Sequence, residues 1–488
     1  MLLSKLIKNA PDVKITNIMT DSRKKRKNSI YFALKGFVND GHNFIQQAID
    51  NGAIVIIHSE PIVNKVEDII YYQVDDVYEL LTQILIRFYN NPSNSITLFG
   101  VTGTNGKTSV TSIIKNIIDY YEPAGYIGTL GVEYKDVKKE PSLTTPLIQD
   151  LYETLSNMKK AKVKNCAVEV SSISLEQKRI NGLDFDFAIF TNFTHDHLDY
   201  HITLESYFES KKILFDNLKE DAYAIVNVDD PKGLDIVKDT KAHIITYAID
   251  NEADFMAKDI KLDKNFTSFT LQYEENTYRI NTNLIAKFNI YNLLASLATL
   301  ITYGLNIEEL IPYLNNLKAI DGRMELINAG QSFNVIVDFA HTPDGILKVM
   351  NYARSITSSN NRIIAVFGSA GKRDYKKRKV FGELANKYCD ITILTEDDPR
   401  DEKVYSIACQ IAEGITEKNY IIIESREDAI RQAVELANSH DTILILGKGN
   451  ERFMYHELGK VDYQGDDNIA RYMIENYGIK GEENHEFQ

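Results

Sequence analysis

Short apolar runs along the chain alternate with longer segments in which apolar residues recur every three or four positions. Runs rich in β-branched and aromatic residues are typical of strands buried on both faces of a parallel sheet. The strongest runs are AIVII (53–57), ITLFGVTG (96–103), NCAVEV (165–170), FAIFTNF (187–193), AIVNV (224–228), IIAVFG (363–368), ITILTED (391–397) and TILILGKG (442–449). Because helical patterns separate them, the sequence predicts an α/β architecture with mostly parallel sheets.

Two polar stretches interrupt this pattern and mark candidate domain boundaries. YNNPSNS (89–95) is a cluster of turn-forming residues, and LKAIDGRME (317–325) precedes a new series of strands and helices. A chain of 488 residues is long enough for roughly three domains of about 150 residues. We therefore expect domains at residues 1–94, 95–321 and 322–488, with a frayed tail at GEENHEFQ (481–488).

The charge balance argues against a general nucleic-acid binder. The chain has 69 acidic and 55 basic residues and a formal net charge of -14, whereas affinity for nucleic acid depends on basic side chains that neutralise phosphates. The basic run RKKRK (23–27) is short and isolated, so we interpret it as a solvated turn. Any phosphate site should therefore be local.

Cysteine usage and hydropathy point to a cytoplasmic protein. Cys166, Cys389 and Cys409 are far apart and lack the spacing of a zinc site, so we expect three reduced thiols. The N-terminal sequence lacks the apolar core and cleavage site of a secretory signal, and no apolar run reaches membrane-spanning length. We expect no membrane partner.

One apolar run continues into a glycine-rich segment, LFGVTGTNGKTSV (98–110). A strand that turns through glycines into a helix brings backbone N–H groups and a helix N-terminus to one point, which favours phosphate binding. Lys107 would reach the β- and γ-phosphates, and the Thr108 hydroxyl would ligate Mg²⁺. Five residues separate Gly100 from Gly106 where the usual loop has four, and a purely structural turn is the alternative. ATP is the expected ligand.

Further polar groups follow two other predicted strands. VEVSS places Glu169 near the end of one strand, and TNFTHDHLDYH places Asn192, His195, Asp196 and His197 just past another. The carboxyl ends of parallel strands are where such sheets bind ligands. A single histidine is more often a surface or core residue than a ligand, but the clustering here favours a phosphate and metal site.

The segment LESYFESKKILFDNL contains a lysine in an apolar stripe. The stripe has helical spacing and includes Leu204, Tyr207, Phe208, Leu214, Phe215 and Leu218. Lys211 falls on this stripe, whereas Lys212 points off it. A lysine there snorkels to solvent, pairs with an anion or becomes chemically altered, because desolvation disfavours its charged form. A neutral amine could react with carbon dioxide, and the resulting carbamate would supply a carboxylate to a second Mg²⁺.

Together these motifs resemble the Mur ligase family, and within it the MurE type, which adds the third residue of the peptidoglycan stem peptide. The resemblance covers almost the whole chain. DSRKKRKNSIYFALKGFVNDGHNFIQQAIDNGA resembles the uridine-binding N-terminal domain. GVTGTNGKTSV resembles the ATP loop, and the order of the other motifs also matches: IGTLG, LTTP, EVSSISLEQKRI, TNFTHDHLDYH, YFESKKILF, KFNIYN, GRME, VDFAHTPDG, VFGSAGKRD, DDPR and GKGNE.

The resemblance implies a role for each of several groups of residues. Ser22 would contact the uracil nucleotide, and the sugar-peptide would be held by Thr144, Thr145, Ser171 and Arg179. ATP would be bound by Gly103, Thr104, Asn105, Gly106, Lys107, Thr108, Ser109, Asn289, Arg323, Asp338 and His341. Metal would be held by Thr108, Glu169, His197 and carbamylated Lys211, with Lys107, His197 and Lys211 serving catalysis. The incoming amino acid would be read by Arg373, Asp398, Arg400, Gly447 and Glu451.

The resemblance also implies a reaction, its cofactors and its partners. The implied fold has a central P-loop-like ATPase domain flanked by a uridine-nucleotide-binding N-terminal domain and a Rossmann-like C-terminal domain. The implied activity is ATP-dependent amide formation through an acyl phosphate, with ATP, Mg²⁺ and carbon dioxide as cofactors. The implied partners are UDP-MurNAc-L-Ala-D-Glu and a diamino acid. We expect a monomer that binds no nucleic acid.

The sequence departs from the family pattern at several positions: Ile173 replaces a histidine, Lys372 an aspartate, Leu147 an acidic residue and Asn450 a histidine. In DDPR, Arg400 would grip a distal carboxylate bidentately, whereas Asp398 stands where an asparagine is usual and would suit a lone ammonium. Because Arg400 is present, we favour meso-diaminopimelate over L-lysine. Ile173 keeps open the alternative of a divergent paralogue with another acceptor or weak catalysis.

Overall fold

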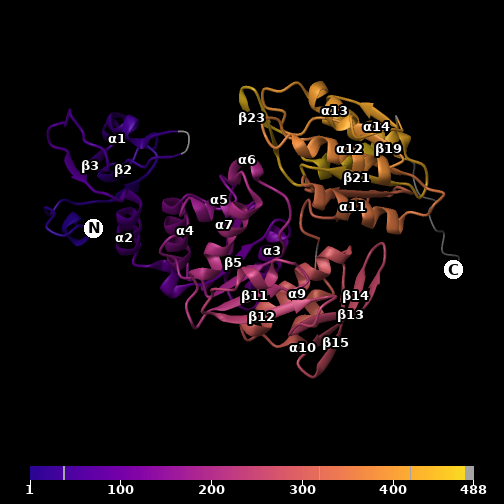
Figure 1. The fold of residues 1–488 in the computed structure, drawn as a ribbon, viewed down its shortest axis with the longest axis horizontal. Helices are drawn as coiled ribbons and strands as arrows, with labels where there is room; N and C mark the ends of the chain where they lie inside the picture. Colours follow the sequence, from indigo (N-terminus) through magenta and orange to yellow (C-terminus); the bar gives the residue numbers. More distant parts are fainter. Residues whose placement is uncertain (37–38, 318, 418, 479–488) are drawn as a thin grey trace.

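The computed structural model describes residues 1–36, 39–317, 319–417 and 419–478, so the tail at 481–488 lies outside the described residues. The chain forms three sheets in sequence order, each covered by helices (Figure 1). They have four, eleven and six strands, and a separate two-stranded hairpin lies near the C-terminus. This confirms the three-domain α/β architecture.

The N-terminal sheet is parallel, in the order β1 (Asn17–Met19), β2 (Ser29–Phe32), β3 (Ala53–His58), β4 (Ile70–Gln73). Its remaining elements are the 3-10 helices η1 (Leu3–Lys5) and η2 (Gly41–Phe44), and α1 (Ile45–Asp50) and α2 (Val77–Tyr89). Buried residues of α2 pack on one face of the sheet, and Ala48 of α1 packs on the other. Two faces covered by helices are what a parallel sheet requires.

The basic run at residues 23–27 begins in a turn and is mostly exposed, as predicted, and two of its side chains also reach the next domain. Lys24 pairs with Asp150 at 3.0 Å, and Arg26 pairs with Glu153 at 3.0 Å. Both carboxylates belong to α4 (Ile148–Lys160) of the next domain. The run therefore joins two domains, a relationship between distant segments that its local charge did not indicate.

The central sheet has the order β15-β14-β13-β12-β11-β10-β5-β9-β6-β7-β8. Its strands are β5 (Thr97–Thr102), β6 (Ala124–Gly128), β7 (Gly131–Tyr134), β8 (Val137–Lys139), β9 (Asn165–Glu169), β10 (Phe187–Phe190), β11 (Tyr223–Asn227), β12 (His243–Ala248), β13 (Phe255–Leu262), β14 (Thr267–Tyr273) and β15 (Asn276–Thr282). The run from β6 to β13 across the sheet is parallel, and both edges are antiparallel. The sequence analysis did not predict these antiparallel edge strands.

Helices cover both faces of this sheet. The helical elements after η3 (Pro92–Ser95) are α3 (Lys107–Tyr121), α4, α5 (Ser172–Glu176), α6 (Leu198–His201), α7 (Leu204–Asp216), α8 (Gly233–Ile236), α9 (Lys287–Thr302) and α10 (Ile307–Leu314). Phe99 and Val101 of β5 face a core built with α3 and α9, whereas Leu98 faces the core built with α4 and α7. The central strand is thus buried on both sides, which explains its continuous apolar run.

The C-terminal sheet has the order β16-β17-β21-β18-β19-β20 and is parallel except for the edge pair β16–β17. Its strands are β16 (Glu325–Leu326), β17 (Asn334–Asp338), β18 (Ile363–Phe367), β19 (Ile391–Leu394), β20 (Tyr420–Ile422) and β21 (Thr442–Leu446), and the hairpin is β22 (Phe453–His456) with β23 (Gly459–Asp462). The helices are α11 (Pro343–Ile356), α12 (Lys376–Tyr388), α13 (Val404–Ala412), α14 (Arg426–Leu436) and α15 (Asp466–Tyr477). Helices α11–α13 cover one face, and α14 and α15 cover the other.

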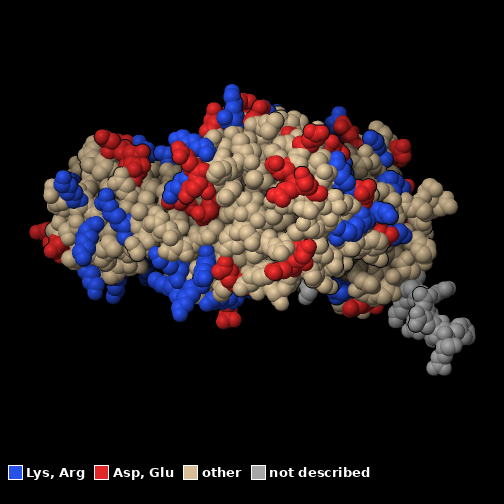
Figure 2. All heavy atoms as spheres, turned by 90° about the horizontal axis from the view of Figure 1, so that it is seen from below, with Lys and Arg blue, Asp and Glu red and all other residues tan. Residues whose placement is uncertain are grey.

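All eight apolar runs contain strands, but several runs extend past the strand end. The strand in ITILTED ends at Leu394, and the strand in TILILGKG ends at Leu446. The residues beyond each end form loops at the carboxyl edge of a sheet, where the site lies. On the face in Figure 2, basic side chains form separate groups with acidic ones between them. Within the described residues, no helix is both long and apolar enough to cross a bilayer.

Candidate functional site

The glycine-rich loop is shorter than the sequence suggested. Strand β5 continues to Thr102, so Gly100 lies inside the strand, where an added Cβ would meet the Phe185 ring at 2.8 Å. The loop itself spans Gly103 to Gly106, and both glycines have positive φ (147° and 88°). Gly100 is therefore a packing residue, which accounts for the irregular spacing.

The segment that follows β10 holds this loop in place. The Thr104 and Asn105 N–H groups donate to the backbone and side-chain oxygens of Asn192, at 2.8 and 3.0 Å. Thr191 Oγ1 donates to the Asn105 carbonyl at 2.6 Å. An added Cβ on Gly103 would lie 1.9 Å from that same hydroxyl. The loop is thus preorganised by a second strand end.

Helix α3 starts at Lys107, directly after the loop, and no side chain caps its N-terminus. Uncapped N–H groups and the helix dipole create a local positive potential at this point. Lys107 Nζ donates to the carbonyls of Gly103 and Thr104, at 2.9 and 2.8 Å, and so lies over the loop. Burial lowers the pKa of this amine, while Glu169 and Asp196 oppose the shift. A phosphate chain fits these donors.

Glu169 at the end of β9 is fully buried beside the start of α3. Its Oε2 accepts from the Thr108 hydroxyl at 3.0 Å, and its Oε1 accepts from the Thr129 N–H at 2.9 Å and from the Tyr126 hydroxyl. A carboxylate and a hydroxyl side by side are the hard oxygen donors that Mg²⁺ prefers. The donor set of Thr108 and Glu169 therefore fits a magnesium ion next to a bound phosphate.

Lys211 of α7 lies directly beneath the loop. Its side chain is only 1% exposed, its Nζ donates to the Gly103 carbonyl at 2.8 Å, and the amine lies 4.4 Å from the centre of the Tyr207 ring. Burial, helped by the nearby charge of Lys107, lowers the pKa of Lys211 well below its usual value. The side chain does not snorkel to solvent, and the lowered pKa favours the neutral form that carbamate formation requires.

The neighbouring Lys212 is also buried, but its surroundings are different. It pairs with Asp216 and Asp239, each at 2.6 Å, on the outer side of the helix. These carboxylates raise the pKa of Lys212 although burial alone would lower it. Two adjacent lysines thus have opposite electrostatic environments, and only one has no carboxylate partner within the described residues.

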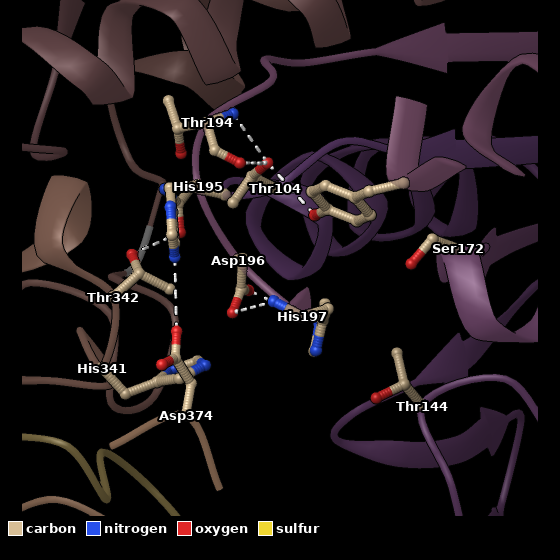
Figure 3. A network of polar contacts seen from close by, with 12 residues as sticks. Thr104, Thr144, Ser172, Thr194, His195, Asp196, His197, His341, Thr342 and Asp374 are labelled. Carbon is tan, nitrogen blue, oxygen red and sulfur yellow. Dashed lines mark hydrogen bonds and ion pairs between the residues drawn. The ribbon is translucent and has the colours of Figure 1, made fainter. Parts of the chain in front are cut away.

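A cluster of acidic and imidazole groups lies beside the loop (Figure 3). His197 has a φ of 54°, and its backbone N–H donates to Asp196 Oδ1 at 2.8 Å. Burial would raise the pKa of Asp196, but His197, His341 and Lys377 lower it to about 2. Burial lowers the pKa of His197. A neutral imidazole at neutral pH is able to ligate a metal.

The C-terminal domain contributes the opposite wall. Arg323 Nη2 donates to the Thr108 hydroxyl at 3.2 Å, and its guanidinium stacks 4.1 Å from the centre of the Phe339 ring. Asp338 at the end of β17 accepts from two backbone N–H groups at 2.7 Å, and burial raises its pKa. Burial and Lys377 lower the pKa of His341 to about 4.

Polar contacts join the two walls. Asn105 Nδ2 donates to Asp344 Oδ2 at 2.9 Å, which ties the phosphate loop to the first turn of α11. His195 lies 3.3 Å from Asp374, a contact drawn in Figure 3. The two domains therefore meet at the loop that would hold phosphate.

One cavity of about 910 Å³ lies between the central and C-terminal domains. The predicted residues that line it are Thr104, Asn105, Gly106, Lys107, Thr108, Ser109, Thr144, Glu169, Ser171, Arg179, Asn192, Asp196, His197, Arg323, Asp338, His341, Arg373 and Glu451. The predicted residues outside its lining are Ser22, Gly103, Thr145, His195, Lys211, Asn289, Asp398, Arg400 and Gly447. Ser22 lies in the N-terminal domain, where its hydroxyl donates to Gln47 at 2.6 Å. The structure thus brings most of the predicted residues into one space.

The wall near β9 has hydroxyl and guanidinium groups. Thr145 Oγ1 donates to the Glu169 carbonyl at 2.7 Å and accepts from the Ser171 N–H at 3.1 Å. Arg179 Nη1 donates to the Thr145 carbonyl at 2.8 Å. Ile173 also lines the cavity, so the unusual apolar residue directly faces the site.

The five residues predicted to read an amino acid lie around the ends of β18, β19 and β21. Arg373 Nη1 is 3.4 Å from Asp199 Oδ2, across the domain boundary. Asp398 and Arg400 both have positive φ, at 46° and 54°. Gly447 has a φ of 114°, and a Cβ there would lie 2.4 Å from Asp397 Oδ2. Burial raises the pKa of Glu451.

Two residues were missed by the sequence analysis. Asn292 lines the cavity and donates to Asn289 at 2.9 Å, and a Cβ added to Gly106 would lie 2.5 Å from its Oδ1. Its position three residues after Asn289 on α9 was a usable signal, because such residues share a helix face. Lys448, in GKGNE, is fully buried and pairs with both Asp398 and Glu451. Local sequence did not indicate its burial.

Comparison with known proteins agrees with this geometry. Three family profiles match: "Mur ligase family, catalytic domain" at residues 14–89, "Mur ligase middle domain" at 101–300 and "Mur ligase, glutamate ligase domain" at 322–449. A protein of Clostridium acetobutylicum named UDP-N-acetylmuramoyl-L-alanyl-D-glutamate--2,6-diaminopimelate ligase 1 is 38% identical over 448 residues, covering 91% of each chain. A Bacillus velezensis protein with the corresponding name is 38% identical, covering 93% of each chain.

Solved structures agree as well. A structure of a UDP-N-acetylmuramoyl-L-alanyl-D-glutamate--2,6-diaminopimelate ligase matches with a TM-score of 0.68 at 27% identity, covering 97% of this chain and 98% of that chain. The MurF ligase of Thermotoga maritima in complex with ADP has the same fold, with a TM-score of 0.64 at 19% identity, covering 94% and 97%. The chain therefore belongs to the Mur ligase family.

Proposed function

We propose that this protein is an ATP-dependent ligase that joins 2,6-diaminopimelate to UDP-N-acetylmuramoyl-L-alanyl-D-glutamate in the synthesis of peptidoglycan precursors. The names of the relatives support this acceptor and this amino acid. The observation that carries the proposal is one cavity lined by both the phosphate loop and the predicted amino-acid residues Arg373 and Glu451. Such a shared space is needed because ATP and the amine must both react with the same carboxyl group of the acceptor.

Each of the three domains would bind a different substrate. Residues 1–94, with Ser22, would bind the uridine nucleotide, residues 95–321 would bind ATP, and residues 322–488 would bind the amino acid. Thr144, Ser171 and Arg179 would hold the peptide end of the acceptor along the β9 wall. Asn105 already contacts α11 of the C-terminal domain, and this contact would couple ATP binding to closure of the two domains.

Bond formation would occur in two steps. The terminal carboxylate of the acceptor attacks the γ-phosphorus of ATP, which forms an acyl phosphate and releases ADP. The amine of the diamino acid then attacks the acyl carbon, loses a proton and expels phosphate. Lys107 would leave its two carbonyl partners and neutralise charge on the phosphate oxygens.

Magnesium and a lysine carbamate fit the residues beside the loop. Thr108 and Glu169 would hold one ion, and His197 with carbamylated Lys211 would hold a second. When bound, Mg²⁺ neutralises phosphate oxygens and orients the transferred group. The low pKa of Lys211 supports the carbamate, because only a neutral amine reacts with carbon dioxide.

The test offers the purified protein ATP, Mg²⁺ and UDP-MurNAc-L-Ala-D-Glu, with meso-diaminopimelate and L-lysine in parallel reactions. Phosphate release and product mass are measured. We expect a tripeptide product with diaminopimelate, and Lys107→Met should lower turnover on the order of 10²- to 10³-fold. Lys115→Met, on the same helix but paired with Asp119 and Glu133, is the matched control and should stay active.

A negative result would favour a different function. Ile173, which faces the cavity, supports one alternative: a divergent member that binds ATP with little turnover or uses another acceptor. ATP binding measured by calorimetry, together with no product from either amino acid, would replace the ligase proposal with this alternative.

A further inference from the structure

Lys448 is a buried cation that joins two of the predicted amino-acid residues. It directly follows the end of β21, its side chain is 1% exposed, and its Nζ lies 2.8 Å from Asp398 Oδ1. The same amine also pairs with Glu451. Burial alone would lower the pKa of Lys448, but Glu451, Asp397 and Asp398 raise it, so the side chain remains an ammonium. A buried charge of this kind is stable only because its partners are present.

The Asp398 carboxylate is held from two directions. Its Oδ1 accepts both from Lys448 Nζ and from the backbone N–H of Tyr455, at 2.8 and 3.0 Å. The second donor belongs to β22, so the hairpin fixes the carboxylate as well. An anion that already pairs with a buried ammonium attracts a second ammonium less strongly than a free carboxylate does. The structure therefore gives Asp398 an internal partner where lysine as substrate would need a free carboxylate.

Arg400 presents the opposite situation. Its Nη1 donates to the carbonyl oxygens of Gly371 and Asp398, at 2.6 and 3.4 Å, and its guanidinium lies 5.7 Å from the centre of the Tyr455 ring. These contacts orient the side chain but do not neutralise it, and across the described ranges no carboxylate pairs with it. A guanidinium without an anion is suited to bidentate binding of a substrate carboxylate.

We propose that Lys448 determines the amino-acid preference of this site. By pairing with Asp398 it engages the carboxylate that stands at the usual asparagine position of DDPR, and it leaves Arg400 as a charge without an anionic partner in the described part of the chain. The site then favours a diamino acid whose distal carbon carries a carboxylate over one that ends in an ammonium. This inference rests on the proposed ligase function and names the residue that selects its substrate.

Three variants test the inference through the ratio of kcat/KM for meso-diaminopimelate to that for L-lysine. Lys448→Met keeps an unbranched side chain that is one atom shorter and removes its charge, so Asp398 loses its ammonium partner, and we expect the ratio to fall on the order of tenfold or more. Asp398→Asn retains an oxygen that can accept both hydrogen bonds, so its ratio should stay near the wild-type value. Lys460→Met removes an exposed charge from β23 and is the matched control.

The double variant Lys448→Met with Asp398→Asn completes the cycle. Because it lacks the freed anion, its ratio should return toward the wild-type value. The inference is overturned if folded Lys448→Met keeps the wild-type ratio. It is also overturned if Asp398→Asn alone changes the ratio as strongly as Lys448→Met was expected to, and this second result does not require Lys448→Met to fold.

Failure of the proposed function would look different. In that case wild-type protein forms no product with either diamino acid, and the inference falls with the proposed function. If wild-type protein forms product but the variants do not separate as described, the ligase function stands and only the role of Lys448 is wrong.

Discussion

The Nζ atom of Lys211 donates a hydrogen bond of 2.8 Å to the carbonyl oxygen of Gly103, the residue at which β5 passes into the phosphate loop. This contact connects α7 to the loop through a buried amine whose pKa is lowered by burial. A residue identified from an apolar stripe thus lies directly beneath the predicted ATP site. Its position suggests that any change in its charge acts on the loop.

Lys211→Met should abolish ligation, because it removes both the hydrogen bond to the loop and the nitrogen that would form the carbamate. We expect added acetate or formate to restore part of the activity, since a small carboxylate can occupy the space of the carbamate group. Product formation with and without carboxylate measures this. Lys212→Met is the matched control and should remain active, because Lys212 pairs with Asp216 and Asp239 on the outer side of α7. Full activity of Lys211→Met without rescue would contradict the carbamate.

Arg400→Met should weaken the use of diaminopimelate much more than the use of lysine. The methionine side chain is unbranched and apolar and lacks the charge, and lost hydrogen bonds to a charged group cost about 1.5–3 kcal/mol, which is roughly 10- to 150-fold in KM. Steady-state kinetics with each amino acid measure the effect. Arg354→Met, which removes a partly exposed pair with Asp390, is the control. Equal losses with both amino acids would show that Arg400 does not read the distal carboxylate.

Arg426→Met should destabilise the C-terminal domain strongly. Arg426 and Asp466 are both 0% exposed and pair at 2.7 Å, so the substitution leaves an uncompensated buried carboxylate, at a cost of about 3–5 kcal/mol. Urea unfolding measures the loss. Arg431→Met on the same helix removes exposed pairs, and its effect should be within about 1 kcal/mol.

Arg426 has a second expected effect, on the amino-acid site. It also donates to the carbonyl oxygens of Glu396 and Leu446, at 3.1 and 2.8 Å. These residues directly precede the DDPR and GKGNE loops. If Arg426→Met folds, we expect its KM for the amino acid to rise more than its KM for ATP; a uniform change would leave Arg426 with a structural role alone.

Stability should fall as the pH decreases from about 6.5 to about 4, and His201 should contribute to this loss. Although a Glu176 carboxylate oxygen lies 3.3 Å from Nδ1, burial together with His197 and Lys211 lowers the pKa of His201 to about 4. Because the pKa of His201 is lower in the folded chain than in the unfolded chain, the unfolded chain binds the proton first as the pH falls. The contribution of neutral His201 to the free energy of unfolding is therefore complete only above the unfolded pKa.

His201→Phe keeps a ring and removes this proton. Urea unfolding gives the free energy of unfolding at several pH values. Between pH 6.5 and 4, this free energy should change less steeply with pH in the variant than in wild type, by up to about 1.4 kcal/mol per pH unit. Parallel slopes for the two proteins would show that His201 titrates alike in the folded and unfolded states.

Much of the fold followed from local pattern. The eight apolar runs contain strands because a strand buried on both faces must be apolar along its length, and β5 has this property. The edge strands of the central sheet escaped prediction because half-exposed strands carry weaker patterns and take their pairing from neighbours. The ion pairs of the basic run escaped prediction for a similar reason, since the carboxylates that pair with Lys24 and Arg26 lie on α4, more than a hundred residues away.

Some features of the site were likewise predictable from local sequence, and others were not. Order and spacing of the motifs determined the family and predicted a phosphate loop ahead of Lys107 and a role for Lys211, because these depend on residues that are close in sequence. Only the tertiary structure decided that Gly100 belongs to the strand, that Asn292 reaches the cavity and that Lys448 holds Asp398. Electrostatic partners are chosen by distance in space and by burial, and neither quantity is encoded in the neighbours along the chain.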